Sequence, residues 1–215
     1  ALVTGGRLNG IGESREGRAY DTGMPRADLS PLPDVSAGDD DALADALADR
    51  GACRIVWLPG KAATRDLRED LLRLAADETM SPAATGRGTG RATQPALRGD
   101  RSLWLDDPRC GAAARAFLAQ LDELRVALNE RLFLNLAEVE AHYARYAPGT
   151  GYARHRDRFR DDEARVLSLV AYLNDGWNEP DGGALRLHLD DGATDIAPIG
   201  GTAVCFRSEI EHEVL

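Results

Sequence analysis

The stretch "GYARHRDRF", residues 151–159, places His155, Arg156 and Asp157 in a row, and two kinds of chemistry use such a triplet. In a protein kinase, His-Arg-Asp opens the catalytic loop, and an Asn five residues after the Asp holds magnesium. Asp162 stands at that position and no Asp-Phe-Gly occurs, which argues against a kinase. In a β-strand, by contrast, side chains two residues apart project from the same face. The triplet therefore favours a strand that presents His155 and Asp157 together.

Two ligands on one strand are part of the 2-His-1-carboxylate triad, which binds Fe(II) and leaves positions open for a cosubstrate and O2. The third ligand must come from elsewhere, and His212 lies 57 residues (212 − 155) after His155, in "EIEHEVL". The alternative is that His155 and Asp157 form a surface pair and that His212 is a hydrogen-bonded core histidine. His142 is ambiguous, and His188, in "LRLHLDD", is expected to point outward.

Short β-rich runs surround this stretch. They are "EVEAHYARYAPG", "ARVLSLVAYLND", "GGALRLHLDDG" and "GGTAVCFRSE", separated by Gly, Pro, Asn and Asp. Upstream, the apolar periodicity predicts helices from near Asp39 to Gly51, over about 62–77 and over about 111–129, with a buried strand in "ACRIVWLPG". Helices followed by a run of strands predict an α+β domain whose second half is an antiparallel barrel or jelly roll.

The first 38 residues differ from the rest of the chain. They are rich in Gly, Pro, Arg and Asp, so we expect an arm over 1–38 and a single domain over 39–215, whose C-terminal end is not represented. The opening "ALVTGGRLNGIG" is similar to the glycine fingerprint of dinucleotide-binding enzymes. That fingerprint needs a helix directly after it, whereas Gly17, Gly23 and Pro25 follow here. Dinucleotide binding is therefore not expected.

Composition excludes several classes of partner. A net charge of −10 argues against binding to nucleic acid or to anionic membranes, since both need a basic surface. Cys53, Cys110 and Cys205 are odd in number and widely spaced, which favours a reducing, cytoplasmic environment. No apolar run approaches the roughly 20 residues that span a bilayer, and no secretory leader opens the chain.

Three ordered motifs resemble one known family. "YAPGTGYARHRD", "RVLSLVAYLNDGWNEPDGGALRLH" and "HEVL" closely resemble the prolyl 4-hydroxylase branch of the Fe(II)/2-oxoglutarate-dependent dioxygenases, in particular bacterial relatives of the hypoxia-inducible-factor prolyl hydroxylases. "LRGDRSLWLDD" adds to the resemblance, which covers about residues 40–215. It implies a double-stranded β-helix (jelly-roll) core with supporting N-terminal helices. It also implies that His155, Asp157 and His212 are the catalytic iron ligands.

The resemblance implies further site residues by position. Tyr172, in "AYLND", looks like the tyrosine that hydrogen-bonds the distal carboxylate of 2-oxoglutarate. Tyr146 and Tyr152 resemble tyrosines that line the metal pocket. Leu185 and Val214 correspond to apolar walls of the cosubstrate slot.

The family also has a loop that covers the substrate and a basic anchor for the cosubstrate. Residues 82–98 contain glycine and arginine but almost no large apolar residue, so we expect a mobile lid there. Arg98 and Asp100 resemble its hinge, where a local ion pair is expected; if exposed, such a pair would stabilise little. The anchoring arginine is expected beyond Leu215, because the sequence ends three residues after the distal histidine. Arg165 and Arg186 are the candidate substitutes.

The implied function is hydroxylation of a prolyl residue in a protein or peptide substrate, with release of succinate and CO2. The implied cofactors are Fe(II), 2-oxoglutarate as cosubstrate and O2, with ascorbate as a candidate reductant. A translation factor such as elongation factor Tu is a candidate substrate. Two alternatives stay open at this point: a small-molecule oxygenase that acts on a free amino acid or a natural product, and a non-catalytic binding module on the same jelly roll.

Overall fold

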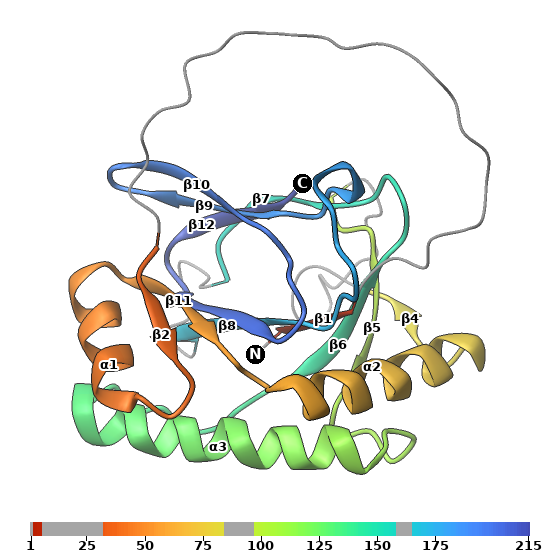
Figure 1. Ribbon diagram of the computed structural model, residues 1–215, viewed down its shortest axis with the longest axis horizontal. Coiled ribbons are helices and arrows are strands. Elements are labelled where there is room, and N and C mark those ends of the chain that lie inside the picture. The colour runs from red at the N-terminus through yellow and green to blue at the C-terminus, as the bar shows by residue number, and fades with distance from the viewer. Residues whose placement is uncertain (1, 6–31, 84–96, 158–164) are drawn as a thin grey trace, which may run out of the picture.

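The computed structural model describes residues 2–5, 32–83, 97–157 and 165–215, which form two β-sheets and three main helices (Figure 1). The larger sheet has the order β2-β3-β11-β8-β1-β6-β5-β4, and the smaller sheet has the order β10-β9-β12-β7. The strands of the larger sheet are β1 (Leu2–Gly5), β2 (Asp34–Ser36), β3 (Ala52–Val56), β4 (Ser81–Pro82), β5 (Asp100–Trp104), β6 (His142–Tyr146), β8 (Leu167–Tyr172) and β11 (Thr202–Arg207). Those of the smaller sheet are β7 (Tyr152–His155), β9 (Leu185–Leu189), β10 (Gly192–Ile196) and β12 (Glu211–Val214).

The helices are α1 (Asp40–Asp49), α2 (Lys61–Ala76) and α3 (Ala112–Leu132), with a short 3-10 helix at Glu179–Asp181. They lie along the side of the larger sheet that faces away from the smaller sheet (Figure 1). The sequence explains where α1 begins, because the Asp39 carboxylate caps it by accepting a hydrogen bond from the Ala42 amide at 3.1 Å. The predicted helix limits agree with these bounds to within a few residues.

Two apolar cores separate these layers. Strand β8 contributes to both, because successive side chains point to opposite faces. Leu169 and Ala171 pack toward the helices, in a core that also contains Leu67 of α2. Val170 and Tyr172 face the smaller sheet, in a second core. Burial on both faces explains why residues 169–172 of β8 are a continuous apolar run instead of an alternating one.

The strand-rich second half and the helical first half confirm a mixed helix-and-strand domain. The antiparallel pairing predicted for the second half holds between its strands in both sheets, whereas the N-terminal strands pair in parallel, β1 with β6 and β8, and β2 with β3. Both parallel strands come from the predicted arm, and residues 6–31 between them lie outside the described part of the chain. The domain boundary at residue 38 stays a prediction. Most of the predicted lid, residues 84–96, also lies outside the described part.

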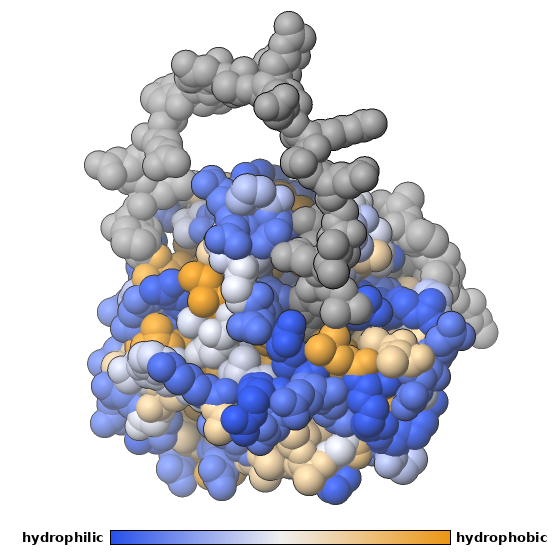
Figure 2. All heavy atoms as spheres, turned by 45° about the vertical axis from the view of Figure 1, so that its right-hand side comes forward, coloured by the Kyte–Doolittle hydropathy of each residue, from blue (hydrophilic) through white to orange (hydrophobic). Residues whose placement is uncertain are grey.

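The hydrophilic surface agrees with the 29% of charged residues in the sequence. On the face shown in Figure 2, hydrophilic residues dominate, and the hydrophobic residues form small separate patches. Within the described residues, the helices are all too short or too polar to cross a membrane.

Candidate metal centre

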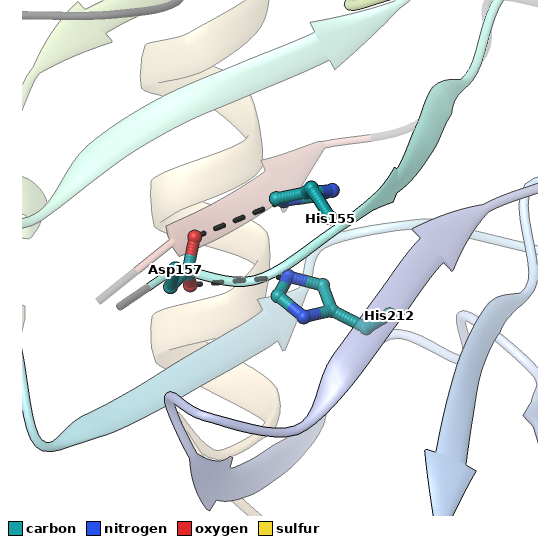
Figure 3. A group of neighbouring side chains, drawn as sticks. All are labelled: His155, Asp157 and His212. Carbon is teal, nitrogen blue, oxygen red and sulfur yellow. Dashed lines mark ion pairs between the residues drawn. The ribbon is translucent and has the colours of Figure 1, made fainter. Parts of the chain in front are cut away.

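Three side chains from two neighbouring strands meet between the sheets. His155 ends β7, Asp157 follows two residues later, and His212 lies on β12 directly opposite His155 in the antiparallel register. One ligand atom from each of the three residues lies within 4.8 Å of the other two (Figure 3). A carboxylate and two imidazoles at this separation could share one metal ion.

Hydrogen bonds orient both imidazole rings. The Nδ1–H group of His155 donates to the Ala153 carbonyl at 2.8 Å, and that of His212 donates to the Ile210 carbonyl at 3.0 Å. Each ring is thereby held as the tautomer whose Nε2 carries a free lone pair. The two Nε2 atoms lie 3.7 and 3.9 Å from the carboxylate oxygens of Asp157. The free lone pairs therefore point into the same small space as the carboxylate.

The electrostatic environment favours the metal-binding protonation states of His155 and Asp157. Burial, assisted by the nearby His212 ring, lowers the pKa of His155 to about 4. Burial alone would raise the pKa of Asp157, but His212, a hydrogen bond from Ser168 and the charge of Arg165 together lower it. At neutral pH the site therefore offers a neutral imidazole and an ionised carboxylate. Metal binding requires this protonation state of its ligands.

A cavity of about 420 Å³ opens beside the triad. All eight predicted site residues line it, and their individual roles stay predictions. The hydroxyl groups of Tyr146 and Tyr172 are buried, and none of the described residues hydrogen-bonds to them. Buried polar groups are nearly always paired, so these hydroxyls fit a bound polar ligand such as a carboxylate. The donor set and the orphaned hydroxyls together fit Fe(II) and 2-oxoglutarate.

The C-terminal end of the predicted lid is attached to this site by a stack of side chains. The Arg98 guanidinium lies 5.0 Å from the centre of the Tyr152 ring, and the Tyr152 ring stacks on His155 with 3.5 Å between ring centres. Arg98 forms two hydrogen bonds to Asp100, of 2.7 and 3.1 Å. This pair is not exposed, since the Asp100 side chain is 0 % exposed and that of Arg98 only 15 %.

The remaining basic candidates differ in position. Arg186 pairs with Asp195 at 2.7 Å and does not line the cavity. Arg165 does line it, 3.5 Å from Asp157. His188 pairs with Glu213 at 3.0 Å outside the cavity lining, as expected for an outward residue.

His142, ambiguous in the sequence, lines the cavity, and its Nε2 atom lies 3.2 Å from the Arg98 guanidinium. Because a guanidinium has only donors, Nε2 accepts this bond. His142 is therefore held neutral, as a partner of Arg98.

Sequence reasoning missed Ser168 and Ser208. The Ser168 hydroxyl donates to the Asp157 carboxylate at 2.6 Å, and the Ser208 hydroxyl lies 2.8 Å from that of Ser168. One signal was available, because Ser168 shares strand parity with Val170 and Tyr172, which face the smaller sheet. A serine on that face of a buried strand needs a polar partner.

Comparisons with known proteins agree with this geometry. Residues 141–215 match the model of the 2OG-Fe(II) oxygenase superfamily. A prolyl-4-hydroxylase from Pseudomonas putida is 39% identical; the alignment covers 82% of this chain and 91% of that chain, with a TM-score of 0.74. A prolyl hydroxylase from Trichoplax adhaerens, solved with a hypoxia-inducible-factor peptide fragment, is 27% identical over 81% of each chain, with a TM-score of 0.69.

Both relatives are aligned over most of their own length, so the resemblance extends well beyond the metal-binding motifs. The ordered motifs, the gathered donor set and the matching relatives all lead to one assignment. The chain belongs to the 2OG-Fe(II) oxygenase superfamily, in its prolyl hydroxylase branch, and is a dioxygenase that uses Fe(II), 2-oxoglutarate and O2.

Proposed function

We propose that this protein hydroxylates a prolyl residue in a protein or peptide substrate, with release of succinate and CO2. The observation that carries the proposal is the cavity in which two histidines and an aspartate converge beside buried tyrosine hydroxyls that no described residue pairs with. The identity to a prolyl-4-hydroxylase and the peptide bound to a second relative support the substrate class. The two facing sheets would form the double-stranded β-helix core of the family.

In this proposal His155, Asp157 and His212 hold the iron. Bound Fe(II) and 2-oxoglutarate together activate O2 for insertion of one oxygen atom into a C–H bond. The protein supplies a fixed set of three ligands, since both imidazoles are locked by hydrogen bonds to main-chain carbonyls. These residues would hold the metal beside the cavity, where it would supply coordination positions for 2-oxoglutarate and O2.

The cavity walls would hold the cosubstrate. The Tyr172 hydroxyl, fully enclosed and unpaired among the described residues, is placed to donate to a carboxylate. Tyr146 offers a second buried hydroxyl, while Leu185 and Val214 supply apolar wall. Tyr152 holds the His155 ring by stacking. Such walls keep water away from the reacting atoms.

The substrate class can be tested directly. Purified protein is incubated with Fe(II), 2-oxoglutarate and ascorbate together with proline-containing peptides and with elongation factor Tu, the candidate substrate that the resemblance implies. Tandem mass spectrometry should locate one added oxygen atom on a prolyl residue, in step with succinate release. Succinate release that free proline stimulates and peptides do not would contradict the proposal and favour a small-molecule oxygenase.

A matched pair of variants shows whether the activity comes from the proposed metal site or from a contaminating enzyme. The variant Asp157→Ala removes the carboxylate from the proposed triad, so it should release no succinate and oxidise no peptide while it stays folded. Glu213→Ala removes a carboxylate on β12 that pairs with His188 outside the cavity lining, and should keep activity. Equal activity in both variants would contradict the ligand assignment.

A further inference from the structure

Two buried serines connect the segments that carry the proposed metal ligands. Ser168 lies on β8 and is 4 % exposed; Ser208, in the turn between β11 and β12, is 0 % exposed. Ser168 contacts Asp157, and Ser208 precedes His212 by four residues (212 − 208). A continuous set of hydrogen bonds therefore runs from the proposed carboxylate ligand to the turn that leads to the distal histidine.

The chemistry of the hydroxyls sets the direction of these bonds. Each serine hydroxyl carries one proton. The proton of Ser168 is donated to the Asp157 carboxylate at 2.6 Å, within the range of a charge-assisted O–H···O⁻ bond. Ser168 has no second proton to offer, so the Ser208 hydroxyl must donate across the 2.8 Å that separates the two oxygens. The relay thus runs from Ser208 to Ser168 to Asp157.

The turn that supplies Ser208 is itself held in place. The Ser208 amide donates to the Val166 carbonyl at 3.0 Å, and the Ile210 amide donates to the Arg207 carbonyl at 2.9 Å. The Ile210 carbonyl in turn accepts the Nδ1–H bond of His212. One short turn therefore orients the distal imidazole through its main chain and the carboxylate through its serine.

We propose that Ser168 and Ser208 are positioning residues of the metal centre, which fix the Asp157 carboxylate relative to the two imidazoles. The relay occupies one lone pair of the carboxylate oxygen Oδ2, while Oδ1 lies 3.5 Å from the Arg165 guanidinium. Without the relay the buried carboxylate can rotate, and the three donors lose their common geometry. This inference rests on the proposed metal assignment.

The test is a titration of the full-length, metal-free protein with Co(II), followed by its visible absorption. Removal of a hydrogen bond to a metal ligand typically weakens metal affinity by about 10- to 100-fold. We expect Ser168→Ala to show a loss in that range together with an altered absorption spectrum, which reports coordination geometry. Ser208→Ala should show a smaller loss. Ser168→Thr, which keeps the hydroxyl, should bind Co(II) more tightly than Ser168→Ala does.

The double variant gives the sharpest criterion. Because Ser208 acts only through Ser168, the variant with both serines replaced by alanine should bind Co(II) no more weakly than Ser168→Ala alone. If the two losses multiply instead, the serines act independently and the relay is refuted. Co(II) affinities and spectra unchanged in Ser168→Ala would also overturn the proposal.

Two controls distinguish a failure of the serine relay from a failure of the metal assignment on which it rests. Ser102→Ala, on β5 and outside the cavity lining, should leave the Co(II) affinity unchanged. Urea unfolding of each metal-free variant shows whether it is folded under the titration conditions. If the unaltered protein fails to bind Co(II), or if Asp157→Ala binds it equally well, the metal assignment itself fails. If the unaltered protein binds and Ser168→Ala binds equally, only the relay fails.

Discussion

At the scale of single residues, the cavity is distinguished by buried tyrosine hydroxyls that have no hydrogen-bond partner among the described residues. The Tyr172 hydroxyl has none among the described residues, whereas the Tyr143 hydroxyl donates to Asp70 at 3.1 Å. A buried, unpaired hydroxyl destabilises the ligand-free protein. Tyr172→Phe should therefore leave the unfolding free energy equal or higher, yet weaken 2-oxoglutarate binding about tenfold, the value of one hydrogen bond to a charged group.

Tyr143→Phe is the matched control for that change. It removes a hydroxyl with a buried partner, so it should lower the unfolding free energy and leave 2-oxoglutarate binding unchanged. Urea unfolding and a cosubstrate titration on both variants measure the two effects. The ligand role of Tyr172 would be contradicted if its variant bound 2-oxoglutarate as well as the unaltered protein.

His142 makes stability depend on pH. Burial, together with the charge of Arg98, lowers its pKa to about 3, compared with about 6.5 in an unfolded chain. Between these values the unfolded chain binds a proton that the folded protein excludes. The stability contributed by the neutral ring is thus complete above pH 6.5 and falls as the pH falls, by about 1.4 kcal/mol per pH unit.

His155 also makes the folded protein less stable as the pH falls, since burial lowers its pKa to about 4. Urea unfolding of the metal-free protein between about pH 7.5 and 5.5 should show a steep loss of stability toward acid. The variant His142→Gln should reduce the slope of the unfolding free energy against pH by the contribution of one bound proton. An equal slope in both proteins would show that His142 is not buried in its neutral form.

At the scale of elements, one carboxylate ties two helices to the larger sheet. Asp70 of α2 accepts hydrogen bonds from Arg73 at 2.6 Å, from the Gly111 amide before α3 at 2.9 Å, and from Tyr143 of β6. Its side chain is 7 % exposed. Asp70→Ala should lower the unfolding free energy by about 3 kcal/mol, because three buried or partly buried donors lose their acceptor.

An exposed acidic residue of the same helix provides the control. Within the part of the chain that the structure describes, the Asp66 side chain bonds only to Arg65, at the surface and half exposed, so Asp66→Ala should change stability by at most about 0.5 kcal/mol. Denaturant titration of both variants makes the comparison. Similar losses of unfolding free energy in the two variants would contradict the role of Asp70 in connecting α2, α3 and β6.

The stem of the predicted lid is a second such connection. The amides of Ala153 and Gly99 form main-chain bonds that join residues 97–99 to β7, and Arg98 pairs with the buried Asp100. Arg98→Ala should destabilise the protein by about 3 kcal/mol, since it leaves a buried carboxylate without its cation. Arg54→Ala breaks a half-exposed pair with Asp34 and should cost at most about 1 kcal/mol. Equal losses in thermal unfolding would mean that the Arg98 pair is no stronger than a surface pair.

At the scale of the whole molecule, local patterns in the sequence predicted the elements well. Leu43 and Leu47 recur at helical spacing behind the Asp39 cap, and α1 forms there. His155 and Asp157 lie two residues apart, and strand geometry favoured their projecting together; the spacing became specific only with His212 and the family motifs, and β7 itself ends at His155. Strand β10, in "GATDI", was not predicted, because it is weakly apolar and pairs only with β9.

Long-range contacts were beyond sequence reasoning. The Ser168–Ser208 bond depends on how β8, β11 and the following turn are placed, across 40 positions of the chain. The burial of Asp100 depends likewise on how the stem of the lid docks beside β7, which the local sequence does not specify. These features follow from the register between strands. Local periodicity favours registers that keep the apolar side chains on one face, but it does not specify which strands pair.

The central claim is that His155, Asp157 and His212 hold a metal to which 2-oxoglutarate binds. Its most direct test is calorimetric titration of 2-oxoglutarate into the protein with and without Mn(II), an inert substitute for Fe(II). We predict binding of one 2-oxoglutarate per chain with Mn(II), none without it, and none in Asp157→Ala under either condition. Equal binding with and without the metal, or unchanged binding in Asp157→Ala, would contradict the account.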